Sequence, residues 1–130
     1  MLYIKVARGV KMDSVIKFSK NWNNKLECDV FTTIRDWSLE KQDYYLSNLT
    51  KIFDVELNGK KKCEAKLIYV DCSAVLGRLS TAVLAMDTGL VEPQKIYELF
   101  KGFGIGLEDR VLLLIFERVK DIGNESCGIL

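Results

Sequence analysis

Two hydroxyls and one guanidinium follow one another within residues 30–36, where the chain runs Val-Phe-Thr-Thr-Ile-Arg-Asp. The β-branched and aromatic residues of this segment predict a strand. Arg35 carries five donors in a planar fork that suits a phosphate, a carboxylate or a base edge, and it stays protonated at working pH. An arginine inside a strand needs a partner, so the segment predicts a ligand site that includes Thr33 and Arg35.

A third candidate is Asp87, because the sequence predicts that one helix ends near Asp87-Thr88-Gly89 and that another begins soon after. A carboxylate at such a junction either caps a helix or acts as the acid of a site. Across a cleft from Thr33 and Arg35, Asp87 would carry a proton or accept a hydrogen bond from a base. Four aromatic side chains either stack on a base or pack in the core: Trp22, Trp37, Tyr44 and Tyr45.

The composition predicts one compact domain over residues 1–130, with 48% apolar and 28% charged residues. The chain has no histidine, and its four cysteines show no C-x-x-C spacing, which argues against a metal site. The glycines at 102, 104 and 106 follow a predicted helix and precede a strand, the reverse of a dinucleotide-binding loop, so no cofactor is expected. No apolar run reaches the roughly 18 residues of a membrane span, and no signal peptide is evident, so we expect a cytoplasmic protein without membrane contact.

The net charge of +1 gives no global attraction to nucleic acid. The halves differ, because residues 1–66 hold 13 basic and 9 acidic residues (+4), whereas residues 67–130 hold 6 and 9 (−3). This asymmetry either forms one basic face or is scattered over a solvated surface. Asn58-Gly59 predicts a hairpin turn. The three lysines that follow, at residues 60–62, either form a solvated tip or contact phosphate.

Hydrophobic periodicity predicts the elements that must position these side chains. A helix at residues 20–27, capped by Ser19, precedes the strand at residues 30–37. Residues 39–49 form an irregular connection or a short helix. Asp71 or Ser73 is expected to cap the helix that follows. The remaining expected elements are strands at residues 2–6, 14–18, 52–57, 63–71 and 111–116, the last one central and buried, helices at residues 74–87 and 92–103, and a tail at residues 121–130.

This order of elements, together with the Thr-Thr-Ile-Arg strand, resembles the ASCH domain, a member of the PUA-like barrel superfamily. The match covers about residues 15–119, and its most specific part is Phe31-Thr32-Thr33-Ile34-Arg35-Asp36. The resemblance implies an α+β fold, a PUA-like mixed β-barrel with flanking helices, and a cleft that binds RNA or a modified nucleobase. The supporting segments are Asp54-Val55-Glu56-Leu57, Asp87-Thr88-Gly89 and Leu113-Leu114-Ile115-Phe116-Glu117.

Some bacterial ASCH proteins remove the acetyl group of acetylcytidine, using a lysine, a threonine nucleophile and a glutamate. By position, the resemblance places the threonine at Thr33, the acid near Asp87 and the lysine at Val30. Valine cannot take the proton that a threonine hydroxyl must lose to become a nucleophile. Lys17 or Lys25 would have to supply an amine from the preceding strand or helix.

Three hypotheses follow. The first is binding of RNA or a modified nucleobase: Arg35 would hold a phosphate or base edge, Thr33 would hydrogen-bond the ligand, Asp87 would accept from an exocyclic amine, and Trp37 would contact the ligand. The second is an amidohydrolase of acylated nucleosides, with Thr33 and Asp87 as catalytic residues. The third is a protein-interaction module that keeps the fold without a ligand.

Overall fold

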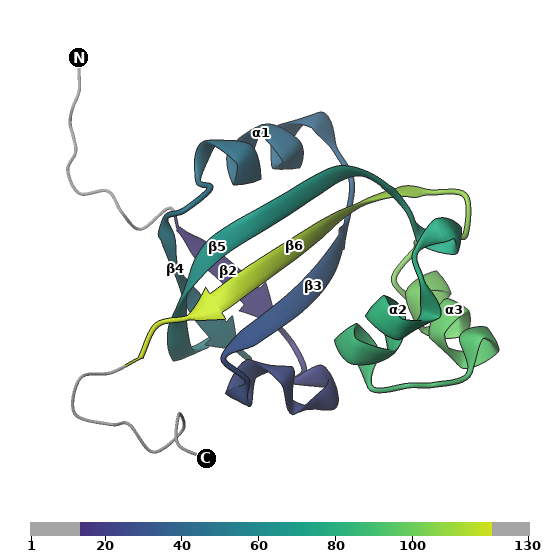
Figure 1. Ribbon diagram of the computed structural model, residues 1–130, viewed down its shortest axis with the longest axis horizontal. Helices are drawn as coiled ribbons and strands as arrows, with labels where there is room; N and C mark the ends of the chain where they lie inside the picture. The colour runs from purple at the N-terminus through teal and green to yellow at the C-terminus, as the bar shows by residue number, and fades with distance from the viewer. Residues whose placement is uncertain (1–13, 121–130) are drawn as a thin grey trace.

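The computed structural model describes residues 14–120, so the predicted strand at residues 2–6 and the predicted tail at residues 121–130 lie outside the described residues (Figure 1). The elements are, in chain order, β2 (Val15–Phe18), the 3-10 helix η2 (Trp22–Glu27), β3 (Val30–Asp36), α1 (Leu39–Ser47), β4 (Ile52–Leu57), β5 (Lys60–Val75), the 3-10 turn η3 (Leu76–Arg78), α2 (Thr81–Thr88), α3 (Pro93–Gly102) and β6 (Arg110–Arg118).

Within residues 14–120, five strands form one mixed sheet in the order β2-β4-β5-β6-β3. β2 runs parallel to β4, whereas the other neighbouring pairs are antiparallel. The sheet curls into a half-barrel, α1 lies near one end of it, and α2 and α3 lie together beside β3 and β6 (Figure 1). The fold is therefore α+β, as predicted, with a curled half-barrel sheet and flanking helices. Each helix of this part of the chain falls short of the length and apolarity that crossing a membrane requires.

A two-residue turn joins β4 to β5. Asn58 and Gly59 in this turn both have positive φ, 55° and 82°. Positive φ at both positions is the geometry of a type I′ turn, whose twist matches that of the two strands and which Asn-Gly favours. The predicted hairpin is confirmed, but the lysines do not form a loop, because Lys60 already pairs with Leu57 at the start of β5.

β5 is longer than the predicted strand, since it continues beyond residue 71 to Val75. Its register against β6 shifts between Leu67 and Tyr69 and again between Asp71 and Ala74. Register shifts of this kind bend a strand and increase its twist. The bends therefore help the sheet to curl. They also interrupt the alternation of side chains between the two faces, so a simple alternating pattern does not predict the full length of the strand.

Capping groups determine where α2 begins and ends. The Ser80 hydroxyl accepts a hydrogen bond from the Val83 amide at the start of the helix, and Gly89 ends it with a left-handed φ of 80°. The expectation that Asp71 or Ser73 caps the helix is wrong. Both residues belong to β5, and Asp71 Oδ1 accepts a hydrogen bond from the Ser73 amide instead.

Two predicted segments differ in detail from the structure. The helix expected at residues 20–27 is a distorted 3-10 helix, because Asn23 and Asn24 have φ of 58° and 53°. Asparagine tolerates this left-handed region better than most residues do. The segment at residues 39–49, expected to be an irregular connection or a short helix, forms α1, whose first turn is capped by the Ser38 hydroxyl.

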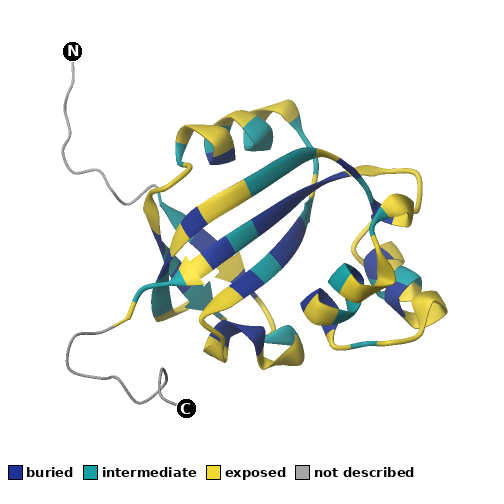
Figure 2. Ribbon diagram, viewed as in Figure 1, coloured by how far each residue is buried: buried dark blue, intermediate teal, exposed yellow. Residues whose placement is uncertain are grey.

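β6 is buried on both of its faces, which explains its uninterrupted apolar sequence. Leu112, Leu114 and Phe116 belong to the cluster inside the curl of the sheet, whereas Val111 and Leu113 belong to the cluster under α2 and α3. Figure 2 shows that most of β6 is coloured as buried. Successive residues of a strand point to opposite faces, so a strand between two clusters needs apolar residues at every position. The predicted central buried strand is confirmed.

Gly77 is a position where a side chain has no room. Its amide donates to the Leu107 carbonyl oxygen at 2.8 Å, and a Cβ at this glycine would lie 2.8 Å from the same oxygen. Because that oxygen belongs to the backbone, we expect Gly77→Ala to displace the loop before β6 and to lower the free energy of unfolding by about 1–3 kcal/mol. Urea unfolding measures this loss.

Gly102 provides the matched control, because a Cβ there would meet no atom within 4 Å. Gly102 ends α3, so Gly102→Ala should be neutral or slightly stabilising, since alanine favours a helix over glycine. Equal unfolding midpoints for Gly77→Ala and the unchanged protein would show that the loop accommodates the methyl group without cost.

Candidate functional site

The two edge strands of the half-barrel, β2 and β3, are bridged by a side chain. Residues 14–120 contain no backbone ladder between these strands, but Arg35 Nη2 on β3 donates to the Lys17 carbonyl on β2 at 2.9 Å. Arg35 Nε donates to Thr33 Oγ1 at 2.9 Å, and the guanidinium carbon lies 4.7 Å from the centre of the Phe18 ring. The partner that an arginine in a strand requires is thus supplied by the chain itself. These bonds use two of its five donors.

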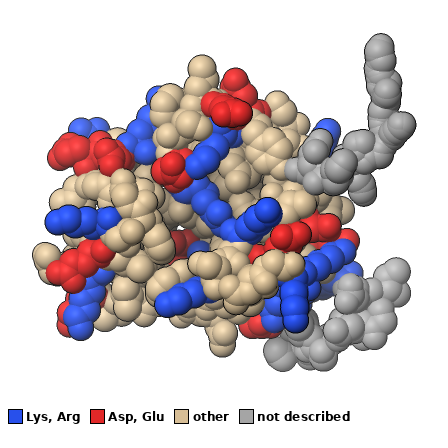
Figure 3. Space-filling view, turned by 180° about the vertical axis from the view of Figure 1, so that it is seen from behind, with Lys and Arg blue, Asp and Glu red and all other residues tan. Residues whose placement is uncertain are grey.

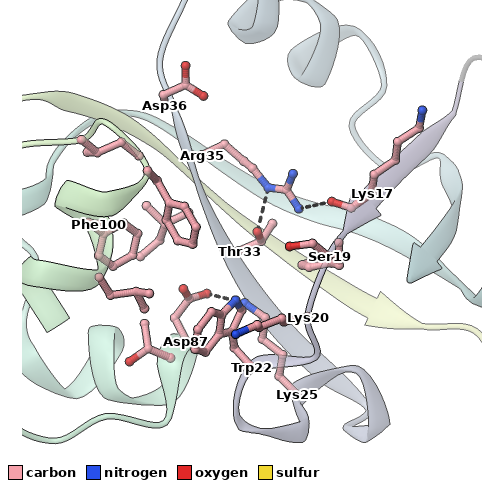
Figure 4. Close-up of a pocket in the computed structure, with 16 residues that line it drawn as sticks. Lys17, Ser19, Lys20, Trp22, Lys25, Thr33, Arg35, Asp36, Asp87 and Phe100 are labelled. Carbon is pink, nitrogen blue, oxygen red and sulfur yellow. Dashed lines mark hydrogen bonds and ion pairs between the residues drawn. The ribbon is translucent and has the colours of Figure 1, made fainter. Parts of the chain in front are cut away.

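A cavity of about 230 Å³ opens beside this bridge, between the sheet edge and the helices α2 and α3 (Figure 4). Thr33, Arg35 and Asp87, the three residues expected to share a cleft, all line it. On the face of the molecule shown in Figure 3, Lys and Arg side chains gather near the centre, with acidic side chains among them. Apart from Thr33, Arg35 and Asp87, much of the cavity lining is apolar or aromatic: Phe18, Trp22, Ile34, Leu99, Phe100, Phe103 and Ile105.

Lys25 and Asp87 form a buried ion pair at the cavity wall. Lys25 Nζ lies 2.8 Å from Asp87 Oδ1, and the two side chains are only 6% and 8% exposed. Burial lowers the pKa of Lys25 below its ordinary value, and this effect outweighs the opposing attraction of the Asp87 carboxylate. Lys25 therefore holds its proton less firmly than a surface lysine does, and its charge depends on a single buried partner.

Local backbone geometry brings these two groups together. The positive φ values of Asn23 and Asn24 turn η2 so that Lys25 is buried and not on the solvent side. The Asn23 side chain donates to the Met86 carbonyl at 3.1 Å, which fastens η2 to the end of α2 directly beside Asp87. The pair therefore joins two segments that are 62 residues apart in the sequence.

The two threonines of β3 have different partners. Thr32 Oγ1 donates to Asp87 Oδ1 at 2.8 Å, whereas Thr33 Oγ1 accepts from Arg35 Nε and lines the cavity. Alternation along the strand explains this separation. A nucleophilic threonine needs both a base and access to its substrate. Here Thr32 contacts the Asp87 carboxylate, the group that would act as the base, whereas Thr33 is the threonine that lines the cavity.

The aromatic candidates are divided between the cavity and the core. Trp22 lines the cavity, but Trp37 is not among its lining residues. The Trp37 indole donates to Gln42 Oε1 at 2.9 Å and packs against the cluster inside the curl. Tyr44 and Tyr45 pack against the same cluster, which supports the alternative that they are core residues.

Lys17 and Lys25 are the two lysines that would have to replace the amine that is missing at Val30. Lys25 extends toward Asp87, whereas the Lys17 ammonium points away from the cavity and only its backbone carbonyl takes part in the site (Figure 4). Val30 itself is exposed, and it lies outside the cavity lining.

Thr32 is a residue of the site that sequence reasoning did not single out. Its hydroxyl donates to Asp87 Oδ1, the same carboxylate oxygen that pairs with the Lys25 ammonium. The signal was present in the sequence, because a Thr-Thr pair in a strand sends one hydroxyl to each face. Within residues 14–120, no group of three or more His, Cys, Asp or Glu side chains is arranged to hold a metal ion.

Around one small cavity the site combines a bridging arginine, the Thr33 hydroxyl, a buried ion pair and aromatic walls, and the Thr32 hydroxyl donates to the carboxylate of that ion pair. Chemically it can donate and accept hydrogen bonds at the edge of a small planar ligand and cover the faces of that ligand. Searches against protein-family models, curated proteins and solved structures found no significant match, so the ASCH resemblance rests on the sequence motifs alone.

Proposed function

We propose that this chain is a cytosolic ASCH/PUA-like domain that binds RNA by holding one nucleoside, ordinary or modified, in the cavity beside Arg35. The observation that carries the proposal is the convergence of hydrogen-bonding groups and aromatic walls on one cavity. Recognition of an unpaired base needs this combination, because the faces of the base stack while its edges form hydrogen bonds. The volume of the cavity, about 230 Å³, is smaller than the roughly 300–1,000 Å³ of sites for drug-sized ligands, so the cavity favours a single base or nucleoside.

Each polar group has a distinct role in this proposal. Within residues 14–120, Arg35 uses two of its five donors, and the other donors would face a base edge or a phosphate. Thr33 Oγ1 already accepts from Arg35, so its own proton is directed to a ligand acceptor. Asp87 accepts from an exocyclic amine, and its ion pair with Lys25 holds the carboxylate in place at the cavity wall.

The second candidate function is an amidohydrolase of acylated nucleosides, favoured by the contact of Asp87 with both Lys25 and Thr32. A lysine that holds its proton weakly, beside a carboxylate and a hydroxyl, is suited to proton transfer. The separation of the base-linked Thr32 from the cavity-lining Thr33 favours binding over this reaction. Release of cytidine from acetylcytidine, abolished by Thr33→Val, would establish the enzyme in place of the binding protein.

Trp22 offers a direct test of ligand binding, because the chain has two tryptophans and Trp37→Phe leaves Trp22 as the single one. In this variant we expect saturable quenching of Trp22 fluorescence by at least one ribonucleoside among adenosine, guanosine, cytidine, uridine and acetylcytidine.

Phe103, which lines the cavity and is 57% exposed, provides the stacking test. Phe103→Ala should weaken binding about fivefold or more, because base stacking on an aromatic side chain contributes roughly 1–3 kcal/mol.

Met86→Ala is the control, since Met86 is 63% exposed and does not line the cavity. It should leave the affinity unchanged. If none of the nucleosides and no short single-stranded RNA quenches Trp22, the binding proposal is wrong, and the interaction module without a ligand becomes the better account of this fold.

A further inference from the structure

We propose that a second cavity, formed around Trp37 and Arg110, binds the nucleotide adjacent to the one held beside Arg35. This inference rests on the proposed function and extends it from a single nucleoside to a dinucleotide step of RNA. The cavity has a volume of about 260 Å³ and is lined by Asp36, Trp37, Gly104, Ile105, Asp109 and Arg110.

The two cavities adjoin, because Asp36 and Ile105 line both of them. Asp36 ends β3, one residue after Arg35, and its carboxylate points away from the Arg35 guanidinium (Figure 4). Ile105, which is buried in the loop before β6, lines both spaces. A ligand with two linked bases can therefore extend from the first cavity into the second along the end of β3.

The second cavity contains a preformed stacking surface. The guanidinium carbon of Arg110 lies 4.2 Å from the centre of the Trp37 ring. Arg110 Nε donates to the Cys72 carbonyl at 2.7 Å, and Gln42 Oε1 accepts from Arg110 Nη2 and from the Trp37 indole. These edge contacts hold the guanidinium over the ring. Since Arg110 is an exposed residue, its other face is available for a base, and arginine planes are common stacking partners of unpaired bases.

The cavity is lined by two carboxylates, Asp36 and Asp109, and their charges are balanced by Lys41, which pairs with Asp36, and by Arg110, so no net negative charge opposes a phosphodiester. Asp36 forms an ion pair with Lys41, and Asp109 Oδ2 accepts from the Gly106 amide at 2.7 Å. Arg110 contributes a positive charge of its own. The chemistry thus suits a base and its sugar, with the linking phosphate near Arg110.

The test compares ribonucleosides with their dinucleotides on the full chain by isothermal titration calorimetry, using adenosine, guanosine, cytidine and uridine with ApA, GpG, CpC and UpU. For the preferred base, we expect the dinucleotide to bind at least tenfold more tightly than the nucleoside. Arg110→Ala and Trp37→Leu should reduce this advantage to less than threefold and leave the nucleoside affinity within twofold. Arg78→Ala removes the same charge from an exposed residue that lines neither cavity, and it should preserve the advantage.

Arg110→Lys keeps the charge without the planar face, and it serves if Arg110→Ala fails to fold. Loss of the dinucleotide advantage in Arg110→Lys supports stacking, whereas an undiminished advantage overturns the stacked subsite. Nucleoside binding with no gain for the dinucleotide also overturns the subsite and leaves the proposed function standing. Dinucleotide binding that depends on Arg110, without any nucleoside binding, places the ligand in the second cavity alone; it refutes the proposed function and overturns the inference that this cavity adjoins an occupied one. Absence of binding by both probes refutes the two proposals together.

Discussion

Lys25→Met should lower the free energy of unfolding by about 3–5 kcal/mol, because it leaves the Asp87 carboxylate buried without its cation. Methionine fills a volume similar to that of the lysine stem, so the loss reports the unpaired charge more than a cavity. Among the described residues 14–120, the Thr32 hydroxyl alone would continue to donate to Asp87 Oδ1. Urea denaturation followed by circular dichroism measures the change.

Two further variants isolate the cause of that loss. In Lys25→Met/Asp87→Asn, the asparagine keeps an oxygen for Thr32 and removes the charge, so we expect more than half of the lost stability to return. Lys41→Met is the matched control, because Lys41 and Asp36 form an exposed pair with side chains 44% and 65% exposed. Its cost should stay below about 1 kcal/mol. Equal losses for Lys25→Met and Lys41→Met would contradict the description of Lys25 and Asp87 as a buried, mutually dependent pair.

Arg35→Met should lower the free energy of unfolding by about 2–3 kcal/mol, the scale of a lost hydrogen bond to a charged group together with the ring contact on Phe18. The larger consequence is local, because Arg35 is the bridge from β3 to β2. Amide hydrogen exchange in Val15–Phe18 should accelerate more than exchange in β6, since β2 is short and, within residues 14–120, would keep only its pairing with β4.

Arg35→Lys tests whether shape or charge makes the bridge. A single ammonium does not reproduce a planar fork that reaches Thr33 Oγ1 and the Lys17 carbonyl at once, so we expect Arg35→Lys to recover less than half of the loss. Uniform acceleration of exchange across the sheet in Arg35→Met, with no excess at β2, would mean that the bridge does not hold the two edges together.

The sequence predicted the elements that have strong local signals. The type I′ turn follows from Asn58-Gly59, whose backbone preference does not depend on the rest of the fold. The buried β6 follows from an apolar run of strand length. The convergence of Thr33, Arg35 and Asp87 on one cavity was a hypothesis drawn from the helix junction at Asp87 and from the family resemblance, and all three residues line that cavity.

Other features depend on tertiary contacts that no local pattern encodes. Lys25 is flanked by polar residues and Leu26, and its burial results from left-handed turns at Asn23 and Asn24 and from a carboxylate 62 residues away. The extension of β5 is concealed because register shifts interrupt its alternation. Arg35 was correctly assigned a partner, but sequence alone could not distinguish a ligand from the Lys17 carbonyl on the opposite edge of the sheet.

The two-sided burial of β6 affects how the molecule loses its structure. One strand supplies Leu112 and Leu114 to one core and Val111 and Leu113 to the other, so neither core can be exposed while the other stays intact. The half-barrel and the helical layer are thus expected to melt as one cooperative unit. A ligand held between them would be coupled to the whole of that transition, so occupancy of the cavity would raise the melting temperature of the entire domain.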